Sequence, residues 1–223
     1  MPRQLSKLRN TTLGEIPEEW TLESLMEFVD DKTDIVAGPF GSNLKVSDYK
    51  SYGIPIIRLQ NIERNKFVNE NIRYISQEKA EELKYHSYKP NDIVLAKLGD
   101  PIGKTCIIPE NVKGGIVVAD VVRIRPSLQK TDTKFLEYAL NSYFCSKQMN
   151  GSSIGTTRPR VNLDQIRYLK LFKPPLKEQQ KIASILSNID LSIQWQRKYK
   201  SKLQDLKKGL MKQLLTGKIR VKV

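Results

Sequence analysis

Cysteine and histidine are scarce in this sequence, which has two cysteines and one histidine among 223 residues. Cys106 and Cys145 lie far apart and form no CxxC spacing, so we expect reduced thiols in a cytoplasmic protein and no disulfide scaffold. Long apolar runs are also lacking, and none approaches the roughly 18 residues that a membrane-spanning helix needs. The N-terminal segment MPRQLSKLRNTTLGEIPEEW is polar, so we expect no secretion signal. We also expect no membrane association, because no basic amphipathic helix carries the large apolar face that it would need.

Catalytic signatures are equally scarce. His86 lies in the loop-like segment KYHSYKPND with no second histidine or cysteine nearby, so we interpret it as a surface residue and not as a metal ligand or base. The segment KPPL, residues 173–176, lacks the amide and the aromatic ring that grip a flipped base in adenine methylation. In LGDPIGKT, residues 98–105, three residues separate the glycines where a phosphate loop has four. We therefore expect no catalytic residue, no metal and no cofactor.

Charge is the first informative property that the sequence does have. Lysine and arginine number 38 against 24 aspartates and glutamates, which leaves a net charge of +14. An excess of this size is expected when the partner is a polyanion, because each phosphate that a basic side chain neutralises releases condensed counterions. Lysine-rich chains are also common for other reasons, so charge alone leaves nucleic-acid binding open.

Residues 1–173 are predicted to form a mixed, β-rich domain of the α+β class. Short runs rich in valine and isoleucine recur between glycine, proline, asparagine and aspartate residues, which is typical of strands. The helices are placed irregularly between them, which favours α+β over strict β-α-β alternation. The expected strands are Ile54–Leu59, Asn71–Ile75, Asp92–Leu98, Lys104–Ile108, Gly115–Arg125 and Tyr168–Leu171. The expected helices are Leu22–Phe28, Ser76–Leu83 and Thr133–Met149.

The pattern changes at Pro174 and Pro175, because a proline disfavours helix in the residue before it. From Lys177 to Leu215 the sequence has no proline, and its apolar residues follow a seven-residue frame. We therefore predict that residues 174–223 contain a long coiled-coil-forming helix that pairs with another helix. A break around residues 191–196, giving two shorter helices that fold back, stays an alternative. The residues predicted to make the pairing are Ile182, Ile185, Ile189, Gln196, Tyr199, Leu203, Leu206 and Leu210.

Four loops of the first domain combine cations with amides and hydroxyls, which are the groups that bind phosphates and base edges. Any single residue of these loops can equally be a solvated loop residue or a DNA contact. Taken together with the charge of +14, the four loops predict contact with double-stranded DNA by at least two of them. The predicted contact residues are Ser42, Asn43 and Lys45 in the first loop, Arg58, Gln60 and Asn61 in the second, Lys97, Asp100, Lys104 and Thr105 at the tip of a hairpin, and Thr156, Thr157, Arg158 and Arg160 in the fourth.

Several segments resemble the specificity subunits of type I restriction–modification systems. They are GPFGSNLK (38–45), GIPIIRLQNI (53–62), NDIVLAK (91–97) with the turn that follows, PPLKEQQKIASIL (174–186) and LLTGKIR (214–220). The N-terminal segment LGEIPEEW (13–20) is similar too, so the resemblance covers almost the whole chain.

The resemblance implies a target-recognition domain that binds the DNA major groove and a spacer helix that forms an antiparallel coiled coil. It also implies methylation subunits bound to the coil and a restriction subunit recruited beyond them. Family members usually carry two recognition domains and two spacer helices, whereas this sequence has one of each, as in a natural half-subunit or a truncated chain. We expect two copies to pair through residues 182–214 as a homodimer that reads an inverted, interrupted target. A standalone DNA-modifying enzyme with unrecognised motifs and a coiled-coil adaptor that binds only proteins stay as alternatives.

Overall fold

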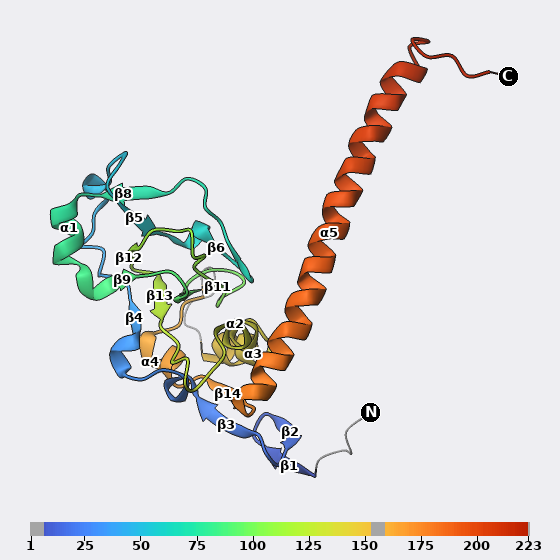
Figure 1. The fold of residues 1–223 in the computed structure, drawn as a ribbon. Helices are drawn as coiled ribbons and strands as arrows, with labels where there is room; N and C mark the ends of the chain where they lie inside the picture. Colours follow the sequence, from blue (N-terminus) through green and yellow to red (C-terminus); the bar gives the residue numbers. More distant parts are fainter. Residues whose placement is uncertain (1–6, 153–158, 223) are drawn as a thin grey trace. The chain divides into compact units, whose positions relative to one another are not determined.

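The computed structural model describes residues 7–152 and 159–222 of the chain. These form two units, Met1–Gln180 and Lys181–Val223, and a continuous helix α5 (Leu176–Leu214) begins at the end of the first unit and makes up most of the second (Figure 1). The first unit is a β-rich α+β structure, as the sequence predicts. Within the described residues, no helix is both long and apolar enough to cross a membrane.

The first unit is built around two four-stranded sheets. Their strand orders are β11-β10-β13-β4 and β8-β5-β12-β9, and all pairings are antiparallel except the parallel pair β5–β12. The first sheet comprises β4 (Ile35–Ala37), β10 (Ile93–Ala96), β11 (Thr105–Ile107) and β13 (Val121–Ile124). The second comprises β5 (Ile54–Ile57), β8 (Arg73–Ile75), β9 (Ser87–Tyr88) and β12 (Gly115–Val117). Smaller pairs are β1 (Leu8–Thr11) with β2 (Gly14–Pro17), β3 (Thr21–Ser24) with β14 (Lys170–Lys173), and β6 (Ile62–Glu63) with β7 (Lys66–Phe67).

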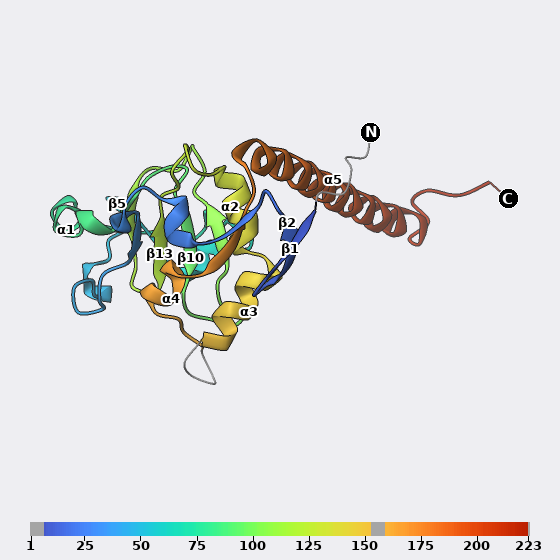
Figure 2. The same ribbon diagram turned by 90° about the horizontal axis from the view of Figure 1, so that it is seen from below.

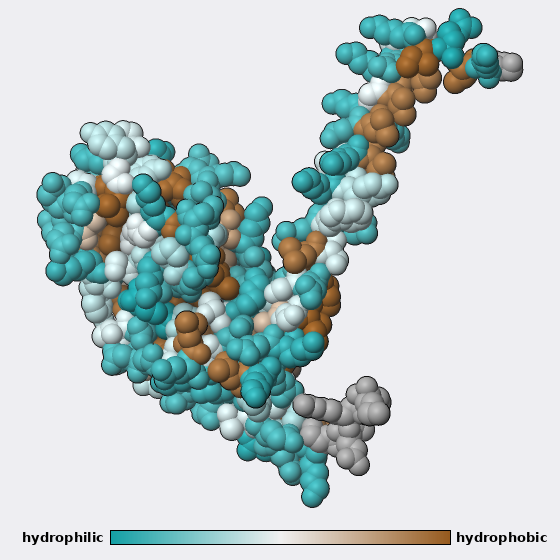
Figure 3. Space-filling view, viewed as in Figure 1, coloured by the Kyte–Doolittle hydropathy of each residue, from teal (hydrophilic) through white to brown (hydrophobic). Residues whose placement is uncertain are grey.

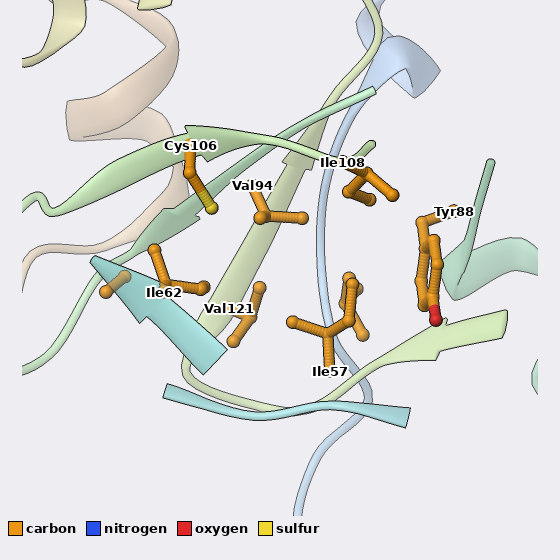
Figure 4. Packing of buried hydrophobic residues seen from close by; sticks show 9 residues of the cluster. Ile57, Ile62, Tyr88, Val94, Cys106, Ile108 and Val121 are labelled. Carbon is orange, nitrogen blue, oxygen red and sulfur yellow. The ribbon is translucent and has the colours of Figure 1, made fainter. Parts of the chain in front are cut away.

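The core lies between these two sheets. Val94, Cys106 and Val121 project from the first sheet toward Ile57 and Tyr88 of the second (Figure 4). All five side chains are at most 3% exposed. Fully burying a Val or Ile side chain stabilises a fold by about 1.5–3 kcal/mol, so β-branched residues on both sheets hold the pair together.

Among the described residues of the first unit are four short α-helices, and side-chain caps fix where three of them begin. They are α1 (Gln77–Glu82), α2 (Thr133–Leu140), α3 (Tyr143–Ser152) and α4 (Leu163–Arg167). The side chains of Ser76, Asp132 and Asn162 accept hydrogen bonds from the first turns of α1, α2 and α4. Figures 1 and 2 both place α1 at the side of this unit away from α2 and α3.

Three sequence-based expectations about elements need correction. Leu22–Phe28 is not a helix, because residues 21–24 pair with β14 as strand β3 and only Leu25–Phe28 form a 3₁₀ turn. The expected helix Thr133–Met149 is two helices, α2 and α3, which are separated by Asn141 and Ser142. The Asn141 side chain accepts from the Thr105 N–H and donates to the Thr105 carbonyl oxygen. The expected strand Gly115–Arg125 is likewise two strands, β12 and β13, separated by a turn at residues 118–120.

The segment PPLKEQQ, residues 174–180, is bonded to residues far from it in the sequence. Gln179, at the start of α5, is 1% exposed, and its Oε1 accepts hydrogen bonds from the Thr131 hydroxyl (2.7 Å) and the Asp132 backbone N–H (3.1 Å). The indole N–H of Trp20 donates to Glu178 Oε2 at 3.1 Å. Hydrogen bonds of Glu178 and Gln179 therefore hold the first turn of α5 against the rest of the first unit.

Helix α5 is continuous over 39 residues, so the alternative break around residues 191–196 does not occur. At about 1.5 Å per residue it is roughly 58 Å long. Its end is capped at Gly217, which has a positive φ of 69° and donates its N–H to Leu214 O. Hydrophobic side chains form a broken stripe along the helix (Figure 3). Among them Ile189 is 52% exposed and Leu206 57% exposed, so the described part of the chain leaves this stripe uncovered.

Candidate nucleic-acid interface

Loops from distant parts of the sequence meet at one surface of the first unit. Two hollows, of about 1100 Å³ and about 360 Å³, share Pro39, Ala119 and Asp120 in their walls, and we call them together the groove. The walls include residues from all four predicted loops. These are Asn43 from the first loop, Arg58 and Gln60 from the second, Lys97 from the third and Arg160 from the fourth.

The first loop is held in place by a glycine. Gly38 donates its N–H to Val121 O at 2.9 Å, and a Cβ at this position would overlap the carbonyl oxygen of Val118. Only glycine allows the backbone to approach the 118–120 turn so closely. The loop then carries Phe40 outward, with 84% of the residue exposed. Ser42, Asn43 and Lys45 are exposed as well.

The second loop divides its predicted residues between surface and interior. Gln60 is exposed, whereas Asn61 is fully buried. The Asn61 amide donates to Val68 O and Glu70 O, both at 3.0 Å, and its Oδ1 accepts from the Arg58 N–H at 3.1 Å. We therefore assign Asn61 a structural role. Arg58 is half-buried, and its Nη2 donates to the carbonyl oxygen of Asn71 at 2.7 Å.

Lys97, Asp120 and Arg160 form the centre of the groove. The Lys97 N–H donates to Asp120 O at 2.9 Å, and Lys97 O accepts from the Val161 N–H at 3.1 Å, so Lys97 joins both other segments. Arg160 Nη2 lies 2.6 Å from Asp120 Oδ1. Burial lowers the pKa of the Lys97 ammonium, and the positive charge of Arg160 adds to that effect while Asp120 opposes it. The cluster therefore concentrates two cations around one carboxylate.

The other residues predicted in the third loop do not line the groove. β10 and β11 form the expected antiparallel hairpin, but Thr105 is fully buried and its hydroxyl donates to Gly103 O at 3.0 Å. Lys104 pairs with Glu63 at 2.9 Å, and Asp100 is exposed. We assign Thr105 a structural role. From the fourth loop, Thr156, Thr157 and Arg158 lie outside the described residues.

His86 is not the free surface histidine that its sequence context suggests. It lines the groove half-buried, with Nδ1 2.7 Å from Ala37 O. Burial lowers the pKa of this imidazole, so the ring is neutral at pH 7. Across residues 7–152 and 159–222, no group of three or more His, Cys, Asp or Glu side chains is placed to hold a metal ion.

Sequence reasoning missed several residues of the groove, among them Asp120 and Phe40. Asp120 lies inside what the valine-rich pattern predicted as one strand, and that pattern hid the turn. Phe40 belongs to the first loop, which was searched only for polar groups. An exposed aromatic ring amid binding loops was the available signal, because such rings contact thymine methyl groups or wedge between base steps.

The groove offers donors, acceptors and the exposed rings of Phe40 and Tyr85, and it is followed in the chain by a helix with an exposed apolar stripe. These features are typical of a binding domain followed by a separate helix that exposes apolar side chains. The family model for the type I restriction modification DNA specificity domain matches residues 18–205. The chain belongs to this family, which confirms the resemblance seen in its sequence.

Curated relatives carry the same designation. The chain is similar to the type I restriction enzyme MjaVIII specificity subunit of Methanocaldococcus jannaschii, with 31% identity over 217 residues, covering 96% of this chain and 49% of that protein. It is also similar to the putative MjaX specificity subunit of the same organism, with 29% identity, covering 93% and 48%. The chain thus spans about half the length of the curated relatives it matches.

Solved structures share the fold. The HsdS subunit from Thermoanaerobacter tengcongensis superposes with a TM-score of 0.62 at 18% identity, over 88% of this chain and 48% of that one. The type I restriction–modification S subunit from M. genitalium gives a TM-score of 0.52 at 17% identity, over 77% and 39%. These likenesses confirm the α+β architecture followed by a long helix.

Proposed function

We propose that this chain reads a short sequence of double-stranded DNA for a type I restriction–modification system. The observation that carries the proposal is the convergence of separately predicted loops. Residues from loops near positions 40, 60, 97 and 160 line one groove, although they are distant in the sequence. Loops held by a rigid sheet unit are well suited to recognition, because the scaffold fixes the geometry of their side chains.

The chemistry of the groove suits DNA. Arg58 and Lys97 supply positive charge for phosphates, and the chain as a whole carries +14. The exposed amides of Asn43 and Gln60 supply paired donors and acceptors of the kind that bind adenine in the major groove. In this assignment residues 1–173 form the target-recognition domain.

We assign catalysis to partners and none to this chain. The relatives are specificity subunits of restriction enzymes, and the groove offers binding groups without an activated nucleophile among its described residues. Methylation and restriction subunits would bind the assembled chain and act on the DNA that it selects, in the cytoplasm.

We further propose that residues 174–223 pair with a second copy. The apolar stripe of α5 repeats at heptad spacing from Ile182 to Leu210 and is exposed over most of its length. A second copy supplies a matching stripe, and the resulting two-fold homodimer would read an inverted target in two parts. Gln196 within the stripe would help to fix the register of the pair at some loss of stability.

Binding to a labelled DNA duplex over a series of salt concentrations tests the DNA-reading proposal. We expect log affinity to fall linearly with log salt, because binding releases counterions. Binding that is absent, or that salt leaves unchanged, would instead support a protein-only adaptor. Turnover by the pure chain with DNA and a labelled methyl donor, or with DNA and Mg²⁺, would contradict the assignment of catalysis to partners.

A further inference from the structure

The carboxylate of Asp120 is unexpected on a surface that we propose to bind phosphates. Among the described residues that line the groove it is the only carboxylate, and it lies where the two hollows meet. A carboxylate repels a phosphate, so its presence weakens non-specific attraction to DNA. Its position at the centre of the groove therefore requires another chemical reason.

The contacts of Asp120 supply that reason. Its Oδ1 holds Arg160 Nη2 at 2.6 Å, with 23% of the Asp120 side chain and 55% of the Arg160 side chain exposed. The backbone on both sides is fixed, because Lys97 bonds Asp120 O through its N–H and the Val161 N–H through its carbonyl oxygen. Within the part of the chain that the structure describes, the guanidinium makes no other hydrogen bond. Asp120 Oδ1 occupies only one of the two N–H groups of Nη2. Nη2 can therefore still donate its second N–H side by side with Nη1, as the fork that binds two acceptors at once.

A planar pair of donors in a fixed orientation matches a guanine base. In the major groove, guanine presents two acceptors, O6 and N7, and arginine bonds both at once. A phosphate contact would gain nothing from the neighbouring carboxylate. We propose that Arg160 reads one guanine of the target and that Asp120 is the positioning residue that holds it. This inference rests on the proposed function and adds one base pair of specificity to it.

Selection from DNA duplexes with a randomised central segment tests the proposal on the full chain. The unaltered chain should enrich a motif that contains a guanine. Arg160→Lys keeps the charge but loses the planar fork, and Asp120→Ala frees the arginine. Each should lower the preference for that guanine by about ten-fold or more while other positions keep theirs. The double variant should show no further loss, because the two residues act as one unit.

Two further variants make the result specific. Asp120→Asn retains an acceptor of the same size and should give a smaller change at the same position. Glu63→Gln removes the carboxylate partner of Lys104 outside the groove with the same change of charge, and its motif should match that of the unaltered chain. Thermal unfolding of all variants checks that the fold is kept.

The outcomes separate the two proposals. If the unaltered chain enriches a motif and the Arg160 and Asp120 variants enrich the same motif with uniformly altered affinity, then Arg160 contacts phosphate and the inference is wrong. A motif without a guanine that depends on Arg160 also overturns it. If the unaltered chain enriches no motif, the proposed function itself fails and this inference fails with it.

Discussion

Gln60 and Asn61 are neighbouring amides with opposite surroundings. Gln60 projects from the second loop into solvent, while Asn61 is fully buried and bonds three backbone groups. Both side chains have the chemistry to read adenine, so composition alone does not separate them. Burial separates them, because a side chain with no exposed surface cannot contact DNA and instead stabilises the loop whose backbone it bonds.

Replacing each amide by alanine should separate folding from binding. Asn61→Ala leaves buried backbone groups without partners and should lower the free energy of unfolding by about 3 kcal/mol. Gln60→Ala should change stability by less than about 0.5 kcal/mol while weakening duplex binding. Urea denaturation and anisotropy with a labelled duplex measure the two effects. Equal stability of both variants would contradict the structural role of Asn61.

His86 should make the fold sensitive to mild acid. Burial lowers its pKa in the folded chain below the ordinary value of 6.5, so the folded state favours the neutral ring. The stability contributed by the neutral ring is present above pH 6.5 and is lost as the pH falls through the lowered pKa. We expect the urea concentration at the denaturation midpoint to decrease as the pH is lowered from 7.5 to about 5.5. The decrease should be smaller in His86→Gln. An identical pH dependence in both proteins would show that His86 is not the group responsible.

At the scale of elements, α5 combines an apolar stripe with strong positive charge. Between Leu176 and Leu214 the helix has nine lysines and arginines against three acidic residues. Its apolar residues recur at heptad positions and remain exposed. The stripe favours pairing with another helix, whereas like charges on two copies oppose it.

Leu206→Ala should weaken self-association of the full chain by on the order of ten-fold or more, because the buried leucine supplies much of one layer of the pair. Lys208→Ala, two residues along and on the outward side of the heptad frame, is the matched control and should leave association intact. Sedimentation velocity over a concentration series measures both. Monomers at every concentration in the unaltered chain would rule out the homodimer.

Prediction from sequence succeeded where the signal was local. The β-branched runs around Ile56 and Val94 form strands, the helix expected at Ser76–Leu83 is present as α1, and the heptad segment forms one long helix. It failed at Leu22–Phe28, where pairing with β14, far along the chain, overrides local helical preference. In the site, the loops could be chosen by composition. Their convergence and the central Asp120 could not, because both depend on contacts between distant segments.

At the scale of the whole molecule, the two proposed activities should respond to salt in opposite directions. Duplex binding should weaken as salt rises, because each counterion released into more concentrated salt gains less entropy. Self-association should strengthen, because salt screens the repulsion between two lysine-rich helices. Anisotropy and sedimentation over the same salt series check both slopes. Slopes of the same sign would show that charge on α5 does not oppose pairing.

We propose above all that this chain chooses the DNA sequence on which partner subunits act. Mapping methylated bases in DNA from cells that co-express the chain with its cognate methylation subunit tests that claim most directly. We predict methylation at one inverted two-part motif, which is absent when either protein is omitted and altered at one guanine by Arg160→Lys. Methylation that is absent, scattered without a motif, or unchanged when this chain is left out would contradict the account.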